Sequence, residues 1–475
     1  MIRHKPIPKA LLLIFILLFF SCNKEKKPNV IFVLADQWRA QDLGYAGNKQ
    51  VQTPNLDKLA LESVVFRNAI SNIPVCSPAR ASLMTGQYPL THGVFYNDKP
   101  LNPEATTIAK IYKKAGYETG YIGKWHLNGH EPGEETFKAR QKYIPKERRQ
   151  GFDFWQVLEC THDYNNSFYY ENSPEIKKWN GYDAIAQTHS AIQYIQEKSF
   201  GKNPFLLFLS WSPPHAPYQT APKEFQKIYK DMKIELRPNV PDSMKSTVTE
   251  WLRGYYAHCT ALDHCIGDLQ KAIKDANLDK NTIFVFTSDH GDMLGSHGEI
   301  KKQKPWEESI NVPFILKYPK MLNAGKINKV FSFPDIMPTL LGLSKLDVPE
   351  TVEGIDFSGE LLKTESLEIN GAYITCPVPF HQWSYKDGGR EYRGIRTERY
   401  TYAKDLNGPW LLYDNQNDPY QMKNLCNKIE YKKLQSELES KLQRLLDERE
   451  DKFLKGEDYM IKWNYTWDGD DSIKQ

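Results

Sequence analysis

Three short apolar runs stand out along the chain, at residues 29–35, 204–210 and 282–288. Each run is rich in branched or aromatic residues and ends at polar residues. A continuous apolar run of this length is typical of a strand that is buried on both faces of a parallel sheet. We therefore predict three central parallel strands.

Segments with helical periodicity lie between these runs. Strands that alternate with helices predict a doubly wound α/β fold, in which a large, mostly parallel sheet is flanked by helices. Binding sites in such sheets lie at the carboxyl ends of the strands, so the polar residues after each run are candidates for chemistry. The predicted helices span residues 55–61, 106–115, 182–198 and 248–275.

The pattern changes after residue 365. Short strands separated by turn residues predict a small antiparallel sheet, and one helix follows at 431–450. We therefore divide the chain into a larger domain at 29–365 and a C-terminal α+β subdomain at 366–475. The stretch 128–180 lacks clean periodicity and is expected to form long surface loops. The predicted C-terminal strands are residues 373–375, 392–397, 399–403 and 410–414.

The start of the chain has the layout of an export signal. Basic residues precede an apolar run at 10–20, which ends at Ser21 and Cys22 and is too short to span a membrane. A cysteine at this place resembles a bacterial lipobox. We predict a lipoprotein signal peptide at 1–22, lipidation of Cys22, a tether at 23–28 and anchoring to the periplasmic face or the cell surface. Cleavage and release without a lipid is the alternative.

Charge and cysteine content narrow the classes of partner. The formal net charge of +3 over 475 residues predicts no nucleic-acid partner. The seven cysteines have no dense or regular spacing that would imply a disulfide framework, although export permits disulfides. We expect most thiols other than Cys22 and Cys76 to be buried and free.

The most specific pattern lies between Cys76 and Gly86, with Pro78, Arg80 and Thr85 at fixed offsets. Proline is suited to a first helical turn, where its missing N–H is not needed. Cys76 would then lie just before the positive end of a helix, close to Arg80. Both features favour an anion and lower the pKa of a thiol. A buried structural cysteine before an ordinary helix is the alternative.

This spacing, C-x-P-x-R-x-x-x-x-T-G, resembles the signature of the type I sulfatases. The resemblance extends from about Asn29 to the segment that ends at Asp414. It implies an alkaline-phosphatase-like fold and hydrolysis of a sulfate ester. It also implies that a formylglycine-generating maturation enzyme oxidises Cys76 to Cα-formylglycine (3-oxoalanine).

Two polar pairs close predicted strands and could hold one divalent metal together with Cys76. They are Asp36 with Gln37, and Asp289 with His290. Helix caps or satisfied polar groups are the alternative for either pair. In the sulfatases these positions are usually Asp-Asp and Asp-Asn, with calcium bound. From this resemblance we expect Ca²⁺. Here an imidazole replaces an amide, and imidazole suits manganese better, so Mn²⁺ is the alternative.

Three further segments supply candidate catalytic groups. Lys124 and His126 stand two apart in a motif that matches the sulfatase G-K-W-H-L, and in a strand they would share one face. His215 lies between prolines after the second apolar run, where a general acid could meet a leaving oxygen.

Lys302 aligns with the sulfate-binding lysine of the family, counted back from the Glu-Glu-Ser that follows. Its neighbours Lys301 and Lys304 are expected to be solvated.

The resemblance also implies a mechanism. Residue 76, hydrated to a diol, attacks sulfur while the metal and Arg80 stabilise the ionised hydroxyl. Lys124, Lys302 and the metal neutralise the sulfate charge. His215 protonates the leaving alcohol, and His126 takes a proton from the second hydroxyl so that sulfate is expelled.

A sulfated oligo- or polysaccharide is the expected substrate. The combination Asp-Gln with Asp-His resembles the phosphonate monoester hydrolases of the same superfamily, so a phosphonate monoester or phosphodiester hydrolase is the runner-up. A non-catalytic glycan-binding surface lipoprotein is a third reading, against which the complete candidate catalytic set argues. Two polar and aromatic clusters are the candidate sugar contacts: His162, Asp163, Asn165, His381, Trp383 and Arg390.

Overall fold

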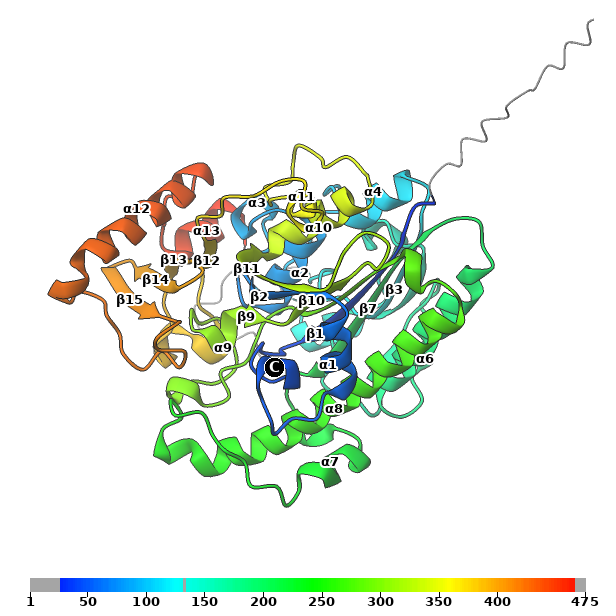
Figure 1. Ribbon diagram of the computed structural model, residues 1–475, viewed down its shortest axis with the longest axis horizontal. Helices are drawn as coiled ribbons and strands as arrows, with labels where there is room; N and C mark the ends of the chain where they lie inside the picture. The colour runs from blue at the N-terminus through cyan, green and yellow to red at the C-terminus, as the bar shows by residue number, and fades with distance from the viewer. Residues whose placement is uncertain (1–25, 131–133, 466–475) are drawn as a thin grey trace, which may run out of the picture.

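A computed structural model describes residues 26–130 and 134–465 of the chain, and its core is one large mixed sheet between two layers of helices (Figure 1). In spatial order the strands are β11 (Gly325–Ser332), β2 (Val64–Ile70), β10 (Phe314–Lys317), β8 (Thr282–Ser288), β1 (Asn29–Asp36), β7 (Phe205–Pro214), β3 (Glu118–Lys124) and β4 (Phe154–Leu158), with β9 (Asn311–Val312) paired to β2. β10 is antiparallel to β2 and β8, β9 is antiparallel to β2, and the other neighbouring pairs are parallel.

The sequence of β1 explains why helices cover both faces. Successive side chains of a strand point to opposite faces. Ile31 and Val33 therefore pack into one core cluster, and Val30 and Phe32 pack into the other. Both sets are fully buried, as a continuous apolar run in a central strand requires.

Each core cluster is completed by its own helices. On one face lie α1 (Pro54–Leu61), α6 (Asp183–Ser199), α7 (Lys223–Tyr229) and the long α8 (Lys245–Asp275). On the other face lie α2 (Cys76–Thr85), α4 (Ile108–Lys114), α10 (Phe333–Leu343) and α11 (Ser358–Leu361). The predicted α/β class, the three central strands and the four helices are thus confirmed, with small shifts of their ends.

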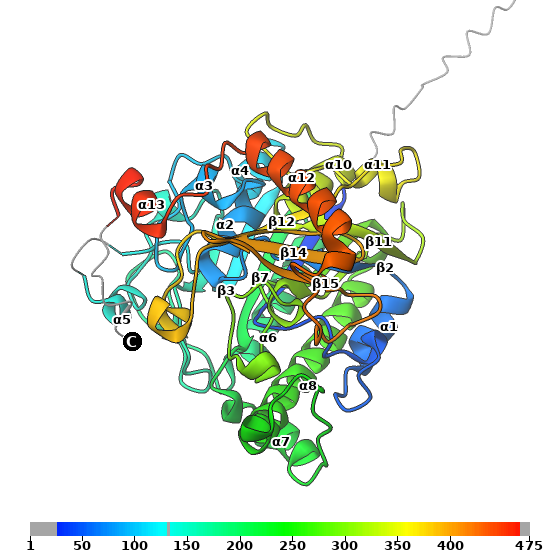
Figure 2. The same cartoon turned by 90° about the vertical axis from the view of Figure 1, so that its left-hand side faces the viewer.

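A second sheet follows the first in sequence and lies beside it. It is an antiparallel meander of β12 (Ala372–Cys376), β13 (Tyr392–Arg396), β14 (Tyr400–Asp405) and β15 (Gly408–Asp414). The helix α12 (Lys432–Glu448) lies across this sheet and buries its leucines there (Figure 2). The predicted antiparallel sheet and the helix predicted at 431–450 are therefore confirmed, and a second, short helix that was not predicted follows at Gly456–Lys462.

The prediction of loops alone at residues 128–180 is wrong. This stretch contains β4, the edge strand of the large sheet, and a two-stranded hairpin of β5 (Phe168–Tyr169) and β6 (Lys177–Lys178). Parallel pairing with β3 stabilises β4, and pairing between distant segments has no local sequence signal.

The remaining helices are short. They are α3 (Pro89–His92), α5 (Thr136–Ala139), α9 (Glu307–Ile310) and α13 (Gly456–Lys462). Among the described residues, no helix is both long and apolar enough to cross a membrane. The predicted signal peptide, the lipobox and Cys22 lie outside the described residues.

The cysteines in the described ranges are free thiols, and only Cys426 is half-buried rather than buried. This agrees with the expectation that most of them are buried and unpaired.

Candidate active site

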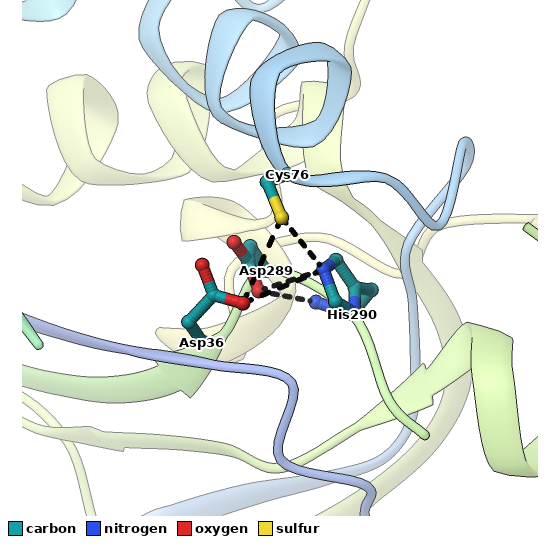
Figure 3. Close-up of side chains that lie close together, drawn as sticks. All are labelled: Asp36, Cys76, Asp289 and His290. Atoms are coloured by element: carbon teal, nitrogen blue, oxygen red, sulfur yellow. Dashed lines mark hydrogen bonds and ion pairs between the residues drawn. The ribbon is translucent and has the colours of Figure 1, made fainter. Parts of the chain in front are cut away.

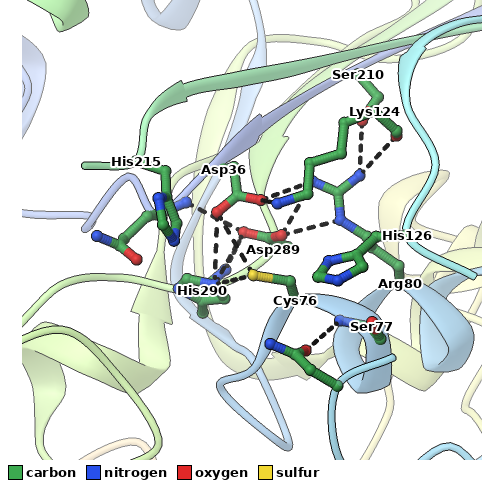
Figure 4. A network of polar contacts seen from close by, with 12 residues as sticks. Asp36, Cys76, Ser77, Arg80, Lys124, His126, Ser210, His215, Asp289 and His290 are labelled. Atoms are coloured by element: carbon green, nitrogen blue, oxygen red, sulfur yellow. Dashed lines mark hydrogen bonds and ion pairs between the residues drawn. The ribbon is translucent and has the colours of Figure 1, made fainter. Parts of the chain in front are cut away.

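The carboxyl ends of four neighbouring strands bring the candidate residues together. Asp36 ends β1, and Asp289 follows β8, the strand paired with it. Lys124 ends β3, and His215 follows β7. Because parallel strands end at one edge of the sheet, residues far apart in sequence converge there (Figure 4).

Cys76 is the first residue of α2, and the whole helix is buried. Pro78 lies in the first turn, as predicted. The helix ends at Gly86, which has a left-handed φ of 67° and whose N–H donates to the carbonyl oxygen of Ser82. A Cβ at this glycine would approach Val352 to 2.8 Å, so the position requires glycine. The fixed spacing from Cys76 to Gly86 is therefore one complete capped helix.

Four side chains form a compact cluster of metal-ligand type, shown in Figure 3. Their candidate ligand atoms all lie within 4.8 Å of one another, and all four residues are buried. Nε2 of His290 lies 3.2 Å from Sγ of Cys76, 3.6 Å from Oδ1 of Asp36 and 3.5 Å from Oδ1 of Asp289.

The hydrogen bond on the far side of His290 shows that this cluster fits a cation. Nδ1 of His290 lies 2.9 Å from the carbonyl oxygen of Gly291, which can only accept. Nδ1 therefore carries a proton, and the ring directs Nε2 toward two carboxylates and a sulfur. This grouping of Asp36, Asp289 and Cys76 around Nε2 favours positive charge at its centre. A divalent ion matches this donor set.

Gln37 is held with its amide oxygen toward the same site. Its Nε2 donates to Oδ2 of Asp292 at 2.7 Å, and its Oε1 accepts from Nζ of Lys302 at 3.2 Å. The hydroxyl of Tyr218 donates to the same oxygen of Asp292 at 2.6 Å. Asp292 and Tyr218 thus set the orientation of the amide, and neither was predicted from the sequence.

Arg80 links the two carboxylates of the cluster. Its Nη2 donates to Oδ2 of Asp36 at 3.1 Å, and its Nε donates to Oδ2 of Asp289 at 3.0 Å. Its Nη1 donates to the Ser210 hydroxyl at 2.7 Å. The guanidinium is buried and fully engaged, so it fixes the carboxylates in place.

Two lysines converge on the space around Cys76. Nζ of Lys302 lies 3.0 Å from Sγ of Cys76, and Nζ of Lys124 donates to Oδ2 of Asp36 at 2.6 Å. Burial and Asp36 oppose ionisation of the Cys76 thiol, but the two lysines outweigh them and lower its pKa well below the ordinary value. The environment therefore favours negative charge at residue 76.

The expectation that Lys304 is solvated is wrong. Its Nζ donates to the carbonyl oxygens of Ile300 and Lys302, at 2.9 Å and 3.2 Å, and the residue is fully buried. It stabilises the loop that presents Lys302, a role that a run of lysines in the sequence does not reveal.

The two candidate catalytic histidines differ in their partners. His126 is not in a strand, because β3 ends at Lys124 and His126 has a left-handed φ of 59°. Its Nε2 lies 3.2 Å from Oδ1 of Asp98. Burial opposes protonation of His126, but the charge of Cys160 and the hydrogen bonds with Asp98 and Cys76 raise its pKa to about 9. Burial and the charge of Lys302 lower the pKa of His215 well below its ordinary value.

A narrow pocket of about 40 Å³ opens above Cys76. A single water molecule needs roughly 10–15 Å³ by this measure, so the pocket has room for one small group of a few heavy atoms. We call the residues at its base and directly beneath the base the pocket floor. Cys76, Lys124, His126, His215 and Lys302 line the pocket, and Asp36, Arg80, Asp289 and His290 contact them from beneath. We call its half-buried mouth the pocket rim: Arg140, His162, His381 and Gln382.

The rim contains only two of the six candidate sugar contacts. His162 lines the pocket and stacks on His215 with ring centroids 4.7 Å apart, and His381 lines it from the short 3₁₀ helix η7 (His381–Trp383) after β12.

The other four candidates are engaged elsewhere. Asp163 accepts hydrogen bonds from Asn166, and Asn165 donates to the carbonyl oxygen of Thr220. Trp383 is buried among the aromatic residues of the second sheet. Arg390 pairs with Asp405. None of these four lines the pocket that the described residues form.

Comparisons with known proteins agree on one family. The family model described as "Sulfatase" matches residues 28–346, and the model described as "N-sulphoglucosamine sulphohydrolase, C-terminal" matches residues 295–448. An ulvan-active sulfatase of Formosa agariphila is 44% identical over 450 residues, which cover 94% of this chain and 86% of that protein.

Two further relatives extend this agreement. An endo-4-O-sulfatase of Bacteroides thetaiotaomicron is 32% identical and covers 85% of this chain and 89% of that protein. The crystal structure of the sulfatase-family protein yidJ from Bacteroides fragilis is 34% identical, covers 90% of this chain and 97% of that one, and superposes with a TM-score of 0.81. The chain, with its alkaline-phosphatase-like fold, belongs to the sulfatase family.

Proposed function

We propose that this protein removes sulfate from sulfated oligo- or polysaccharides. The observation that carries the proposal is the position of Cys76, which lies at the start of a buried helix between two lysines and a cluster of metal-ligand type. Its relatives include an ulvan-active sulfatase and an endo-4-O-sulfatase. A narrow cationic floor suits one sulfate group, and the sugar then remains at the rim.

The proposal includes conversion of Cys76 to formylglycine by a maturation enzyme and one divalent ion. Asp36, Gln37, Asp289, His290 and residue 76 would hold the ion, with Ca²⁺ expected and Mn²⁺ as the alternative. The ion would supply Lewis-acid stabilisation of negative charge, and hydrated formylglycine would supply a hydroxyl nucleophile.

The chain's own residues then perform charge and proton transfer. Arg80 holds Asp36 and Asp289 in position, while Lys124 and Lys302 bind the sulfate oxygens and neutralise charge as the ester bond breaks. His215 gives a proton to the leaving oxygen. A bound sulfate brings negative charge next to His215 and so offsets the Lys302 charge that lowers its pKa.

His126 accepts the proton from the second hydroxyl of residue 76, and Asp98 stabilises the resulting imidazolium. This step requires His126 to be neutral when sulfate leaves, whereas its pKa of about 9 favours the protonated ring before substrate binds. The proposal therefore includes an order: His126 first loses its proton, and only then does it accept the proton of the second hydroxyl.

The test combines chemistry at residue 76 with turnover. Peptide mass spectrometry should find the loss of sulfur at residue 76, and the converted enzyme should release inorganic sulfate from defined sulfated oligosaccharides. Preference for phosphonate monoesters over every sulfated glycan would favour the phosphonate hydrolase instead. Binding without turnover of either class would favour the glycan-binding lipoprotein.

We also propose that the protein is exported and lipid-anchored through Cys22. The motivation is the basic start, the apolar run and the Ser21-Cys22 junction. Cys22→Ala should move the protein from the membrane fraction to the soluble fraction. A wild-type protein that is already soluble and begins at another residue would refute this proposal.

A further inference from the structure

The pocket carries more positive charge than a single sulfate group requires. Three permanent cations line it, Lys124, Arg140 and Lys302, and no aspartate or glutamate of the described chain does. Lys124 and Lys302 act on residue 76 directly, since their charges lower the pKa of its thiol. Arg140 is a third cation, and its side chain donates its hydrogen bonds to Asp98 rather than to Cys76 or the metal-ligand cluster.

Arg140 is fixed in position but not fully used. Its Nε donates to Oδ1 of Asp98 at 2.8 Å, and its Nη2 donates to Oδ2 at 2.7 Å. Its Nη1 has no hydrogen-bond partner within the residues that the structure describes. Because the bidentate pairing fixes the plane of the guanidinium, Nη1 is a donor with a preset direction.

Exposure places Arg140 at the mouth of the pocket. Its side chain is 15% exposed, whereas that of Lys124 is 1% exposed. The pocket encloses only about 40 Å³, so a sulfate on the floor leaves the sugar ring and its other substituents beside the rim. An arginine at that depth meets a substituent of the sugar rather than the sulfate that is removed.

Among the described residues of the rim, no acidic side chain competes with a substrate anion for Arg140. Burial lowers the pKa of His381, and the charges of Lys301, Lys302 and Arg140 lower it further, so His381 is neutral and close to Arg140. His162 and Gln382 are the other rim residues, and neither is acidic. In the described part of the chain, the carboxylate that Arg140 contacts is that of Asp98, which is 2% exposed.

We propose that Arg140 binds a second anionic group of the substrate while the floor holds the sulfate that is removed. This group is a carboxylate or a second sulfate, on the same sugar or on its neighbour. The proposal rests on the proposed sulfatase activity and narrows it to substrates that carry at least two negative charges. A charge-assisted hydrogen bond from arginine suits either group.

The competing explanation is that Arg140 only neutralises Asp98 and so positions His126. Asp98 contacts both side chains, and its Oδ1 lies 3.2 Å from Nε2 of His126. A role through His126 would slow every substrate equally, because the proton transfer is common to all. A role in binding affects only substrates with the second anion.

The experiment measures kcat and KM for four sulfate esters. They are a small aryl sulfate, a neutral oligosaccharide with one sulfate, the same oligosaccharide with one added carboxylate, and the same with one added sulfate. Arg140→Gln should lower kcat/KM for the dianionic oligosaccharides by about 10- to 100-fold, mainly through KM. Turnover of the neutral monosulfated oligosaccharide should change by less than about threefold.

Two matched variants keep this test decisive. Arg140→Lys retains the charge and should recover part of the preference for dianionic substrates. The double variant Asp98→Asn with Arg140→Gln leaves no unpaired buried carboxylate, and it should show the same selective loss on top of any general loss. An equal loss on all four substrates, or a wild type with no preference for a second anion, would overturn the proposal.

A binding measurement separates this inference from the activity itself. Calorimetry with a Cys76→Ala variant should give tighter binding of a dianionic than of a monoanionic oligosaccharide, and Arg140→Gln should abolish the difference. This comparison decides the role of Arg140 even if the wild type turns over no sulfate ester. The carboxylated and disulfated ligands show which anion it prefers, and equal binding of all ligands contradicts it.

Discussion

The pocket floor and the pocket rim are built in different ways. Most floor residues follow the ends of β1, β3, β7 and β8 or lie on the capped helix α2, and a loop presents Lys302. Hydrogen bonds and ion pairs from Arg80 and Lys124 hold the floor carboxylates in place. Rim residues come from loops or a one-turn helix and are half-buried, and apart from the Asp98 pair of Arg140 their side chains make few hydrogen bonds. Rigid strand ends fix the chemistry, whereas loops can change without disturbing the sheet. The floor therefore determines the reaction and the rim determines the substrate.

The largest expected effect comes from removing the nucleophile in the floor. Cys76→Ala should lower the rate of sulfate release at least about a thousandfold for every substrate, because no hydroxyl can form at residue 76. Cys426→Ala removes a half-buried thiol between β15 and α12 and serves as the control. Full activity in the Cys76 variant would refute the mechanism.

A second change in the floor should cost less and should also act on every substrate. Asp289→Asn removes one of the two carboxylates that face His290 and Arg80, so we expect at least about a hundredfold loss together with weaker binding of a divalent ion. Asp335→Asn, at the buried cap of α10, is the matched control. Elemental analysis alongside the assay measures the bound metal, and activity in metal-free enzyme would contradict the site.

A change in the rim should depend on the substrate. His381→Ala should lower kcat/KM for the natural oligosaccharide by up to about tenfold, the value of one hydrogen bond, and should spare a small aryl sulfate. His189→Ala changes an exposed histidine on α6 and is the control. If both substrates lose equally, His381 supports the fold or the chemistry and the division between floor and rim fails there.

The smallest expected effect lies behind the floor. Tyr218→Phe removes one of the two hydrogen bonds to Oδ2 of Asp292 and leaves that of Gln37, so we expect a loss of about fivefold, in metal affinity more than in kcat. Tyr229→Phe also deletes a buried hydroxyl, one that contacts Thr260 on α8, and controls for stability. Unchanged metal binding in the Tyr218 variant would show that the amide needs no such support.

The sequence predicted the centre of the molecule better than its edges. The strands β1, β7 and β8 were recognised because both of their faces are buried, which produces continuous apolar runs. The strands β3 and β4 were missed. Glu118–Lys124, which forms β3, contains glycine, threonine and charged residues, and it is held in the sheet by pairing with β7 and β4, which are distant in sequence. Local patterns report burial, but they do not report pairing between remote strands.

The same contrast holds for the site. The floor residues were found through motifs that fix residue type and spacing. Asp98, Arg140 and Tyr218 were missed because they lie in irregular loops and act through contacts with residues far along the chain. Asp292 had one usable signal, since it follows Asp289 by three residues after the same strand.

The burial of Cys76 sets an order of events during biosynthesis. The side chain is 1% exposed, and the helix that it begins is covered by segments as late in the chain as Gln303 and Phe380, which line the same pocket. No other enzyme can reach a residue at that depth in the folded protein. If Cys76 is oxidised, the oxidation must therefore come before the C-terminal half has folded over it. A chain that folds too early would keep its thiol, and the resulting protein would be stable, correctly assembled and permanently inactive.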